Sequence, residues 1–190
     1  MPGAQRVLRG LLIAAAVSLT AWLALQMAVG QVFTVTAASM EPGLSEGDRV
    51  LVLRPTIDRA ITRGDVVVAD VRGTFTTGSP DTGLRAGTVF APAPGDAYVV
   101  KRVVAGPGDR LRCCTSTGRL VLNGEPLDEP YLPPGTPAST DRFDVVVPDG
   151  RWWLMGDNRD VSEDSRAHLG SPGGGTVPTD VVIGRVVASW

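Results

Sequence analysis

The hydrophobic residues of this chain follow one pattern up to residue 40 and a different one afterwards. No charged residue occurs at positions 10–40, and most residues from Leu11 to Val29 are apolar. A helix needs about 20 such residues to cross the hydrocarbon core of a bilayer. The pattern therefore predicts a transmembrane helix over residues 10–30, preceded by a short terminus at residues 1–9.

The charges that flank this apolar stretch predict its orientation. Arg6 and Arg9 precede it, and the first charge after it is Glu41. The positive-inside rule then places residues 1–9 in the cytoplasm and residues 31–190 outside. The rival interpretation is a cleavable secretory signal, because Val35-Thr36-Ala37 resembles a small-residue cleavage site. Signal peptides usually have an apolar stretch of only about 7–15 residues, which favours the retained anchor.

After Ser39, short runs rich in β-branched residues alternate with Gly, Pro and Asp, the pattern of strands joined by turns. Asn123-Gly124 lies between two such runs and predicts a tight hairpin. Residues 73–95 and 130–142 are predicted to be long loops, and residues 170–175 a flexible connector. We expect a single all-β domain over residues 31–190. The predicted strands are Val50–Leu53, Asp65–Val71, Ala97–Val104, Arg110–Cys114, Arg119–Leu122, Phe143–Val147, Arg151–Met155 and Val181–Val187.

The composition excludes two classes of function. Of the 190 residues, 18 are basic and 20 acidic, so no basic surface for nucleic acid is expected. One histidine and two adjacent cysteines provide no plausible zinc ligand set, and no metal or organic cofactor is implied. Cys113 and Cys114 would form a vicinal disulfide, pair between molecules, or remain small buried hydrophobes.

Lys101 is the only lysine among the 18 basic residues. Arginine keeps its proton at accessible pH, whereas a desolvated lysine amine loses it and then serves as a general base. Strand alternation places Lys101 on the same face as Val99 and Val103, and an apolar face would lower its pKa. The competing interpretation is an edge-strand lysine that discourages aggregation.

Two further segments strengthen the catalytic interpretation. Ser39 follows the predicted anchor closely, and a serine nucleophile needs a neighbouring base. A Ser/Lys pair dispenses with histidine, although a serine before Met-x-Pro is by itself typical of a turn. The second segment, residues 156–166, is densely polar and directly follows the apolar run 152–155. An Asx turn with a surface salt bridge is the alternative for that segment.

Together these segments resemble the bacterial type I signal peptidases, in the order that the family has them. They are the Ser39-Met40-x-Pro42 box, the box from Tyr98 to Asp109 that contains Lys101-Arg102, and the box Gly156-Asp157-Asn158-Arg159-x-x-Ser162-x-Asp164-Ser165-Arg166. The richness in arginine is similar to that of actinobacterial members. The resemblance implies a membrane-anchored serine endopeptidase with a mainly β catalytic domain behind an N-terminal transmembrane helix. Its substrates would be exported preproteins, cut after small-x-small sites.

The resemblance also assigns roles to individual residues. Ser39 would attack the scissile carbonyl, Lys101 would take its proton, and Ser162 would hydrogen-bond the lysine amine and aim it. The remaining matched residues would be structural: a salt bridge of Asp164 with Arg166, and a turn shaped by Asp157, Asn158 and Arg159.

Oxyanion and substrate contacts are less fully defined. The backbone N–H of Ser39 is one oxyanion donor by geometry. Some members add a serine hydroxyl at the position held here by Ala37, so the second donor stays open between a backbone N–H and a water. We expect the substrate to bind as an added strand along Phe33–Ala38 and Tyr98–Lys101. The candidate contact residues are Phe33, Val35, Ala37, Tyr98 and Val99.

These features predict a monomeric single-pass protein of the bacterial cell membrane, with the lipid bilayer as a partner. Three other functions stay open. A self-cleaving repressor-type protease shares the Ser/Lys chemistry but carries no anchor. A membrane-tethered, non-catalytic signal-peptide-binding β module is the alternative outside enzymes. A dedicated role in pilin or sortase-associated processing is the third.

Overall fold

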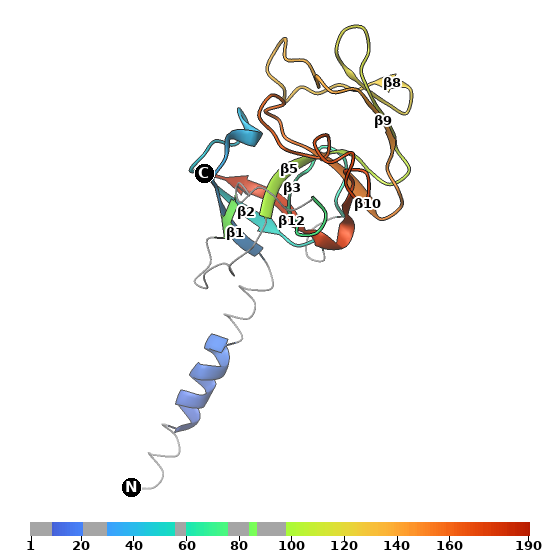
Figure 1. The fold of residues 1–190 in the computed structure, drawn as a ribbon. Coiled ribbons are helices and arrows are strands. Elements are labelled where there is room, and N and C mark those ends of the chain that lie inside the picture. The colour runs from blue at the N-terminus through green and yellow to red at the C-terminus, as the bar shows by residue number, and fades with distance from the viewer. Residues whose placement is uncertain (1–8, 21–29, 56–59, 76–83, 87–97) are drawn as a thin grey trace, which may run out of the picture.

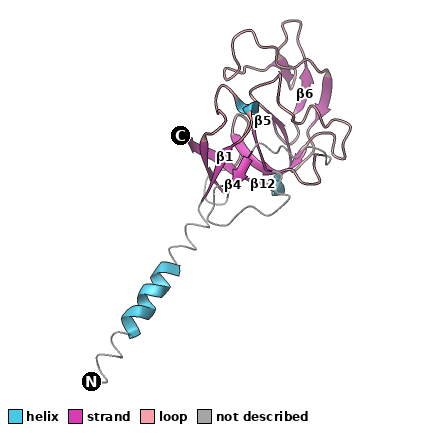
Figure 2. Cartoon of the chain, turned by 60° about the vertical axis from the view of Figure 1, so that its left-hand side comes forward, coloured by secondary structure: helices cyan, strands magenta, loops and turns pink. Residues whose placement is uncertain are grey.

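The computed structural model of the chain describes residues 9–20, 30–55, 60–75, 84–86 and 98–190 (Figure 1). Within these residues strands dominate, and the predicted mainly β fold is confirmed. Figure 2 shows the helical parts: a helix at residues 9–20 and two short 3-10 helices, η1 (Ala38–Met40) and η2 (Thr179–Val181).

The larger sheet has eight strands in the order β11-β10-β5-β3-β12-β2-β1-β4, and each neighbouring pair is antiparallel. The C-terminal strand β12 lies inside the sheet, between β3 and β2. Gly184 permits this close approach, because a Cβ there would lie 2.1 Å from the carbonyl oxygen of Leu53. The strands are β1 (Gly30–Val35), β2 (Arg49–Leu53), β3 (Val66–Asp70), β4 (Leu84–Ala86), β5 (Tyr98–Ala105), β10 (Arg151–Met155), β11 (Val177–Pro178) and β12 (Val182–Ser189).

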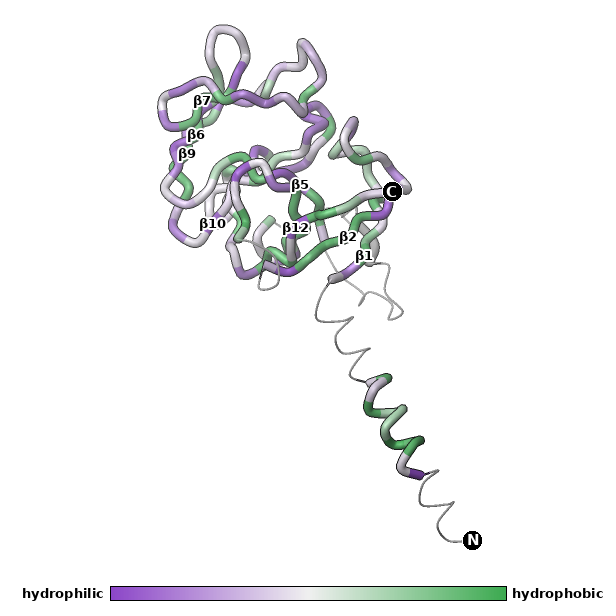
Figure 3. Tube along the Cα trace, turned by 180° about the vertical axis from the view of Figure 1, so that it is seen from behind, coloured by the Kyte–Doolittle hydropathy of each residue, from purple (hydrophilic) through white to green (hydrophobic). Residues whose placement is uncertain are grey.

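The smaller sheet has the order β8-β7-β6-β9 and lies at the end of the β body away from β1 and β2 (Figures 1 and 3). Its strands are β6 (Arg110–Cys113), β7 (Leu120–Leu122), β8 (Glu125–Pro126) and β9 (Phe143–Val146). The predicted hairpin joins β7 to β8: Asn123 has φ 53° and Gly124 has φ 94°. Both turn residues therefore adopt the left-handed conformation that the Asn-Gly pair favours.

All eight predicted strands are present, with ends within two residues of the prediction. Ala97 lies outside the described residues. The prediction missed β1, β4 and β11, and it indicated β8 only as the second arm of the hairpin. Gly30, which we placed at the end of the anchor, is instead the first residue of β1, because the chain enters the sheet immediately after the apolar stretch.

The predicted anchor is described only in part. A helix covers residues 9–20, whereas residues 1–8 and 21–29 lie outside the described residues. No helix in the described part of the chain is long and apolar enough to cross a membrane. The helix is largely hydrophobic, as its colour in Figure 3 shows, and its apolar side chains are exposed. Those that are more than half exposed are Leu11, Leu12, Ile13, Val17 and Leu19.

Strand β5 connects the parts of the core. The buried apolar residues form three clusters, and β5 contributes Val100 to one, Val103 to the second and Val104 to the third. Each of these valines is at most 2% exposed. Burial of this strand against three clusters fixes its backbone, and any side chain that it carries is fixed with it.

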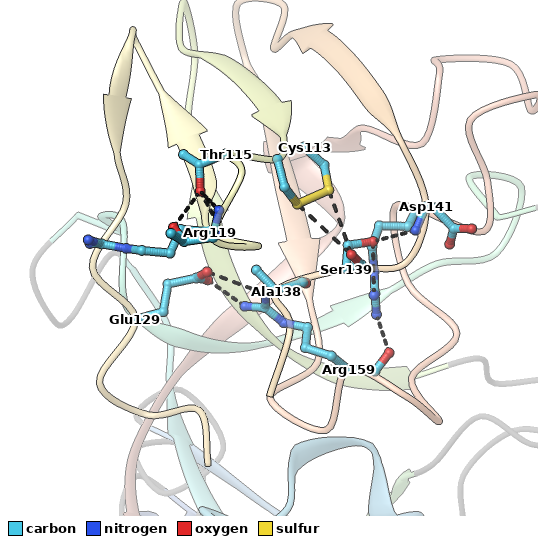
Figure 4. Close-up of a disulfide and its surroundings, with 11 residues drawn as sticks. Cys113, Thr115, Arg119, Glu129, Ala138, Ser139, Asp141 and Arg159 are labelled. Atoms are coloured by element: carbon cyan, nitrogen blue, oxygen red, sulfur yellow. Dashed lines mark hydrogen bonds and ion pairs between the residues drawn. A yellow bond between two sulfur atoms is a disulfide. The ribbon is translucent and has the colours of Figure 1, made fainter. Parts of the chain in front are cut away.

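Cys113 and Cys114 form a disulfide at the end of β6, which is one of the three alternatives for this pair. Both sulfur atoms lie against the carbonyl oxygen of Ser139, at 3.8 and 3.9 Å (Figure 4). The disulfide therefore belongs to the packing between the smaller sheet and the segment before β9.

Candidate active site

The structure brings Ser39 and Lys101 together, although 62 positions separate them in the sequence. Ser39 lies in η1, just after β1, and Lys101 lies near the middle of β5. The distance from Lys101 Nζ to Ser39 Oγ is 2.8 Å, a hydrogen bond. The only histidine, His168, instead stacks on the ring of Phe75, with centroids 4.1 Å apart.

The surroundings of Lys101 favour its neutral form. The residue is 4% exposed, and burial is the main reason why its pKa falls from 10.5 to about 8. Asp164, Glu163 and Asp157 oppose this change through their negative charge, whereas Arg166 reinforces it. With such a pKa, about one amine in ten is neutral at pH 7, against fewer than about one in a thousand for an ordinary lysine.

Asn158 holds the backbone of Ala38 and Ser39. Its N–H donates to the carbonyl oxygen of Ser39 at 3.1 Å, and its side-chain Nδ2 donates to that of Ala38 at 3.1 Å. The resemblance assigns Asn158 only to the shape of its own turn. The structure adds two hydrogen bonds that fix the orientation of η1 relative to the 156–166 loop.

Gly156 lies where no side chain fits. A Cβ at this position would lie 2.2 Å from Ser162 Oγ and 2.4 Å from the carbonyl oxygen of Ser39. Ser162 is thereby placed next to the backbone of Ser39. Its hydroxyl is buried and has no hydrogen-bond partner among the described residues, so the expected bond to the lysine amine is not formed in this structure.

Asp164 and Arg166 form a buried ion pair, as the resemblance implies. Two bonds of 2.9 Å join the guanidinium to the carboxylate, and the N–H of Gly156 donates to Asp164 Oδ2 at 3.0 Å. Burial alone would raise the pKa of Asp164, but the bonds from Arg166 and Gly156 hold it below its ordinary value. The carboxylate stays ionised and keeps the 156–166 loop closed on itself.

Asp157 and Arg159 bind partners outside their own turn. Asp157 accepts two bonds from Arg102, at 2.8 and 2.6 Å. Arg159 donates to the carbonyl oxygen of Gly156 at 3.0 Å and pairs with Glu129 at 2.5 Å. No pattern in the sequence indicated the partner Glu129, which lies beside a segment that we predicted to be a loop.

The substrate-contact predictions need correction at two positions. Phe33 and Val35 are each 1% exposed and pack into the core. Strand β1 is also paired on both edges, with β2 and with β4, so it has no free edge there for a peptide. Ala37, Tyr98 and Val99 are half-buried near the ends of η1 and β5.

A sequence model of the family described as "Signal peptidase, peptidase S26" matches residues 6–190. The chain belongs to the signal peptidase family. Members of this family are serine endopeptidases that remove signal peptides, and this is the activity of the chain. The resemblance stated from the three sequence boxes is thereby confirmed.

Individual relatives agree with this assignment. The chain is 33% identical to signal peptidase I of Mycobacterium tuberculosis, over 97% of this chain and 72% of the relative. It is 34% identical to the probable signal peptidase I of Mycobacterium leprae, over 85% of this chain and 69% of the relative. It is 31% identical to signal peptidase IB of Staphylococcus aureus, over 81% of this chain and 74% of the relative. The mycobacterial relatives agree with the actinobacterial character of the sequence.

The chain is also similar to a crystal structure of a signal peptidase I from Enterococcus faecalis. The two are 21% identical with a TM-score of 0.44, and the match covers 68% of this chain and 98% of the other.

Replacing Gly156 by alanine tests the packing of the site. The added Cβ must displace Ser162 or the backbone of Ser39, so we expect Gly156→Ala to lower kcat for preprotein cleavage by about a hundredfold, or about 2.7 kcal/mol. Gly170→Ala is the matched control, since no atom lies within 4 Å of its Cβ position. Equal kcat values for the two variants, at equal thermal stability by circular dichroism, would contradict the packing argument.

Proposed function

We propose that Ser39 and Lys101 are the catalytic dyad of this signal peptidase. The observation that carries the proposal is the 2.8 Å contact between the Ser39 hydroxyl and an amine that is almost wholly buried. The neutral amine accepts the hydroxyl proton while Oγ attacks the scissile carbonyl carbon. The resulting ammonium gives its proton to the leaving amine, which leaves an acyl-enzyme ester on Ser39. Lys101 then deprotonates a water that hydrolyses this ester.

Ser162 is the group that we assign to aim the lysine amine. Its support is the buried hydroxyl that has no partner among the described residues and sits against Gly156, beside the backbone of Ser39. Burying a hydroxyl without a hydrogen-bond partner costs free energy, so a hydrogen bond from the Lys101 amine to Ser162 Oγ during the reaction would be favourable.

The backbone N–H of Ser39 is the oxyanion donor that we assign. It lies on the attacking residue itself, so it faces the same carbonyl as Oγ. Ala37 has no hydroxyl to add, and its extended backbone (φ −145°, ψ 151°) leads directly into η1. The second donor is a backbone N–H or a water.

The substrate peptide is proposed to pair with β5 rather than with β1. Within the described residues, the pairing of β10 with β5 covers Arg102 to Ala105 and does not extend to residues 99–101. A peptide added at that edge would pass Lys101 and reach Ser39 in an extended form. Preproteins with small residues at the first and third positions before the cut are the substrates that we expect.

Residues 10–29 are proposed to anchor the protein in the bacterial membrane as a single span, with residues 1–9 in the cytoplasm and the β domain, which begins at Gly30, outside. The support is the uncharged run at 10–40 and the exposed apolar side chains of the helix at 9–20. Such an exposed apolar surface is expected where lipid covers it. The anchor would hold Ser39 near the outer membrane surface.

Cleavage of a preprotein with an Ala-x-Ala site, in detergent, tests the dyad. We expect the wild type to cut after the second Ala, and both Ser39→Ala and Lys101→Arg to lose at least about a thousandfold in kcat. Lys101→Arg keeps the charge but cannot become a neutral base. Arg112→Lys, on an exposed strand position, is the conservative-exchange control. Cleavage by Lys101→Arg at the wild-type rate would overturn the dyad. Binding of the peptide without cleavage by the wild type would indicate the non-catalytic binding module.

The pH dependence of kcat/KM reports the ionisation of Lys101 in the free enzyme. Because only the neutral amine acts as a base, we expect kcat/KM to rise with pH through an apparent pKa of about 8. Glu163 raises the pKa of Lys101, so Glu163→Gln should shift this rise to lower pH, whereas Glu125→Gln should not. A rise near pH 10 in the wild type would contradict the burial argument.

Membrane association follows from the proposed anchor. We expect the full chain to stay with the membrane fraction through an alkaline carbonate wash, and a chain lacking residues 1–29 to appear in the soluble fraction. Release of the full chain by the wash would show that residues 10–29 do not span the bilayer.

A further inference from the structure

The segment that joins the two outer strands of the smaller sheet, residues 127–142, reaches the catalytic loop at two places. At its first end, Glu129 and Tyr131 contact arginines of the site. Further along, the carbonyl oxygen of Ala138 accepts a bond of 2.7 Å from Arg159 (Figure 4). We call residues 127–142 the bracing segment.

Tyr131 supports the arginine next to the dyad lysine. The guanidinium carbon of Arg102 lies 4.0 Å from the centre of the Tyr131 ring, the geometry of a cation–π contact. The same guanidinium makes the two bonds to Asp157, and it donates to the carbonyl oxygen of Gly64 at 2.7 Å. The aromatic face therefore fixes the plane in which Arg102 holds Asp157.

Glu129 supports the second arginine. Its Oε1 accepts a bond of 2.5 Å from Arg159 and one of 2.7 Å from the Tyr131 hydroxyl. The side chains of Arg159 and Glu129 are 1% and 5% exposed, so each is the counter-charge that the other needs inside the protein. Arg159 in turn donates to the carbonyl oxygen of Gly156, the residue that packs against Ser39.

The hydrogen bond from the Tyr131 hydroxyl to Glu129 persists over the working range of pH. Burial, reinforced by the charge of Glu129, raises the pKa of Tyr131 well above its ordinary value, so its hydroxyl remains a donor. Within the described part of the chain, the side chains of Glu129 and Tyr131 bind each other, Arg102 and Arg159, and make no hydrogen bond to Ser39 or Lys101. Their effect on the dyad passes through Arg102 and Arg159.

We propose that Tyr131 and Glu129 are positioning residues of the peptidase: Tyr131 fixes the Arg102–Asp157 pair, and Glu129 fixes Arg159 against the Gly156 carbonyl. Through these two routes the bracing segment sets the distance between Ser39 and Lys101. The proposal rests on the dyad assigned above.

The test is a comparison of kcat and KM for the Ala-x-Ala preprotein among four variants of the full chain in detergent. Tyr131→Leu removes both ring and hydroxyl, and we expect kcat to fall about tenfold while KM changes less than about twofold. Tyr131→Phe keeps the ring under Arg102 and should retain kcat within about threefold. Glu129→Gln keeps the shape but removes the counter-charge of Arg159, and kcat should fall at least about tenfold. Asp128→Asn is the matched control, because the neighbouring Asp128 side chain is 90% exposed.

A double variant shows whether Tyr131 acts through the Arg102–Asp157 pair. If it does, Tyr131→Leu combined with Asp157→Asn is no slower than Asp157→Asn alone. If the losses in kcat of the two single variants multiply in the double variant, Tyr131 does not act through the Arg102–Asp157 pair. Assays are run well below the unfolding midpoint of each variant, measured by circular dichroism.

The outcomes separate this inference from the proposed function. Normal kcat in both Tyr131→Leu and Glu129→Gln, with an active wild type, overturns the positioning roles only. If Tyr131→Leu does not fold, a folded Glu129→Gln with unchanged kcat has the same consequence. A wild type that does not cut the preprotein, or Ser39→Ala that cuts it as fast, overturns the dyad and this inference with it.

Discussion

The burial of one amine beside a serine hydroxyl is the interaction on which the rest of the structure depends. Lowering the pKa of Lys101 from 10.5 to about 8 disfavours its ammonium form by roughly 3 kcal/mol. Burial in the apolar surroundings of β5 disfavours the ammonium form, whereas nearby carboxylates favour it and would restore the ordinary pKa. Asp164 and Asp157 both raise the pKa of Lys101, and each is paired with its own arginine. The ion pairs thus keep the loop in place while they limit the negative field at the amine.

The nucleophile depends on a different constraint, which is the position of its backbone. Helix η1 is only three residues long, too short to orient Ser39 by itself. Asn158, 120 positions further along the chain, orients η1 through its hydrogen bond to the carbonyl oxygen of Ala38. Gly156 has no side chain, which leaves room for η1 to pack against the 156–166 loop. Both residues belong to the loop that Asp164 closes. One loop therefore determines the surroundings of Lys101 and the orientation of Ser39.

Local signals in the sequence predicted the strands and the hairpin, because β-branched runs and Asn-Gly act over a few residues. Residue chemistry made Lys101 a candidate base but left an edge-strand lysine equally open, and the resemblance of the three sequence boxes assigned the roles of Ser39 and Lys101. The errors have a common cause. Phe33 and Val35 were placed at a substrate edge, but β2 and β4 cover that strand, and such pairing depends on residues far away in the chain. Glu129 was missed for the same reason: its partner Arg159 lies 30 positions away.

The smaller sheet is connected to the strands of the site by an apolar cluster, and its bracing segment adds directional contacts to Arg159 and Arg102. Apolar side chains of similar volume often stabilise a fold as well as a buried ion pair does. Apolar contacts have little directionality, however, whereas a guanidinium that makes two bonds to a carboxylate fixes both distance and plane. Arg102 and Arg159 each join a different pair of segments, and Tyr131 lies within reach of both, at 4.0 and 6.0 Å from its ring centre. If Ser39 and Lys101 are the proposed dyad, the segment between the outer strands of the smaller sheet would thereby support the 2.8 Å contact on which their chemistry depends.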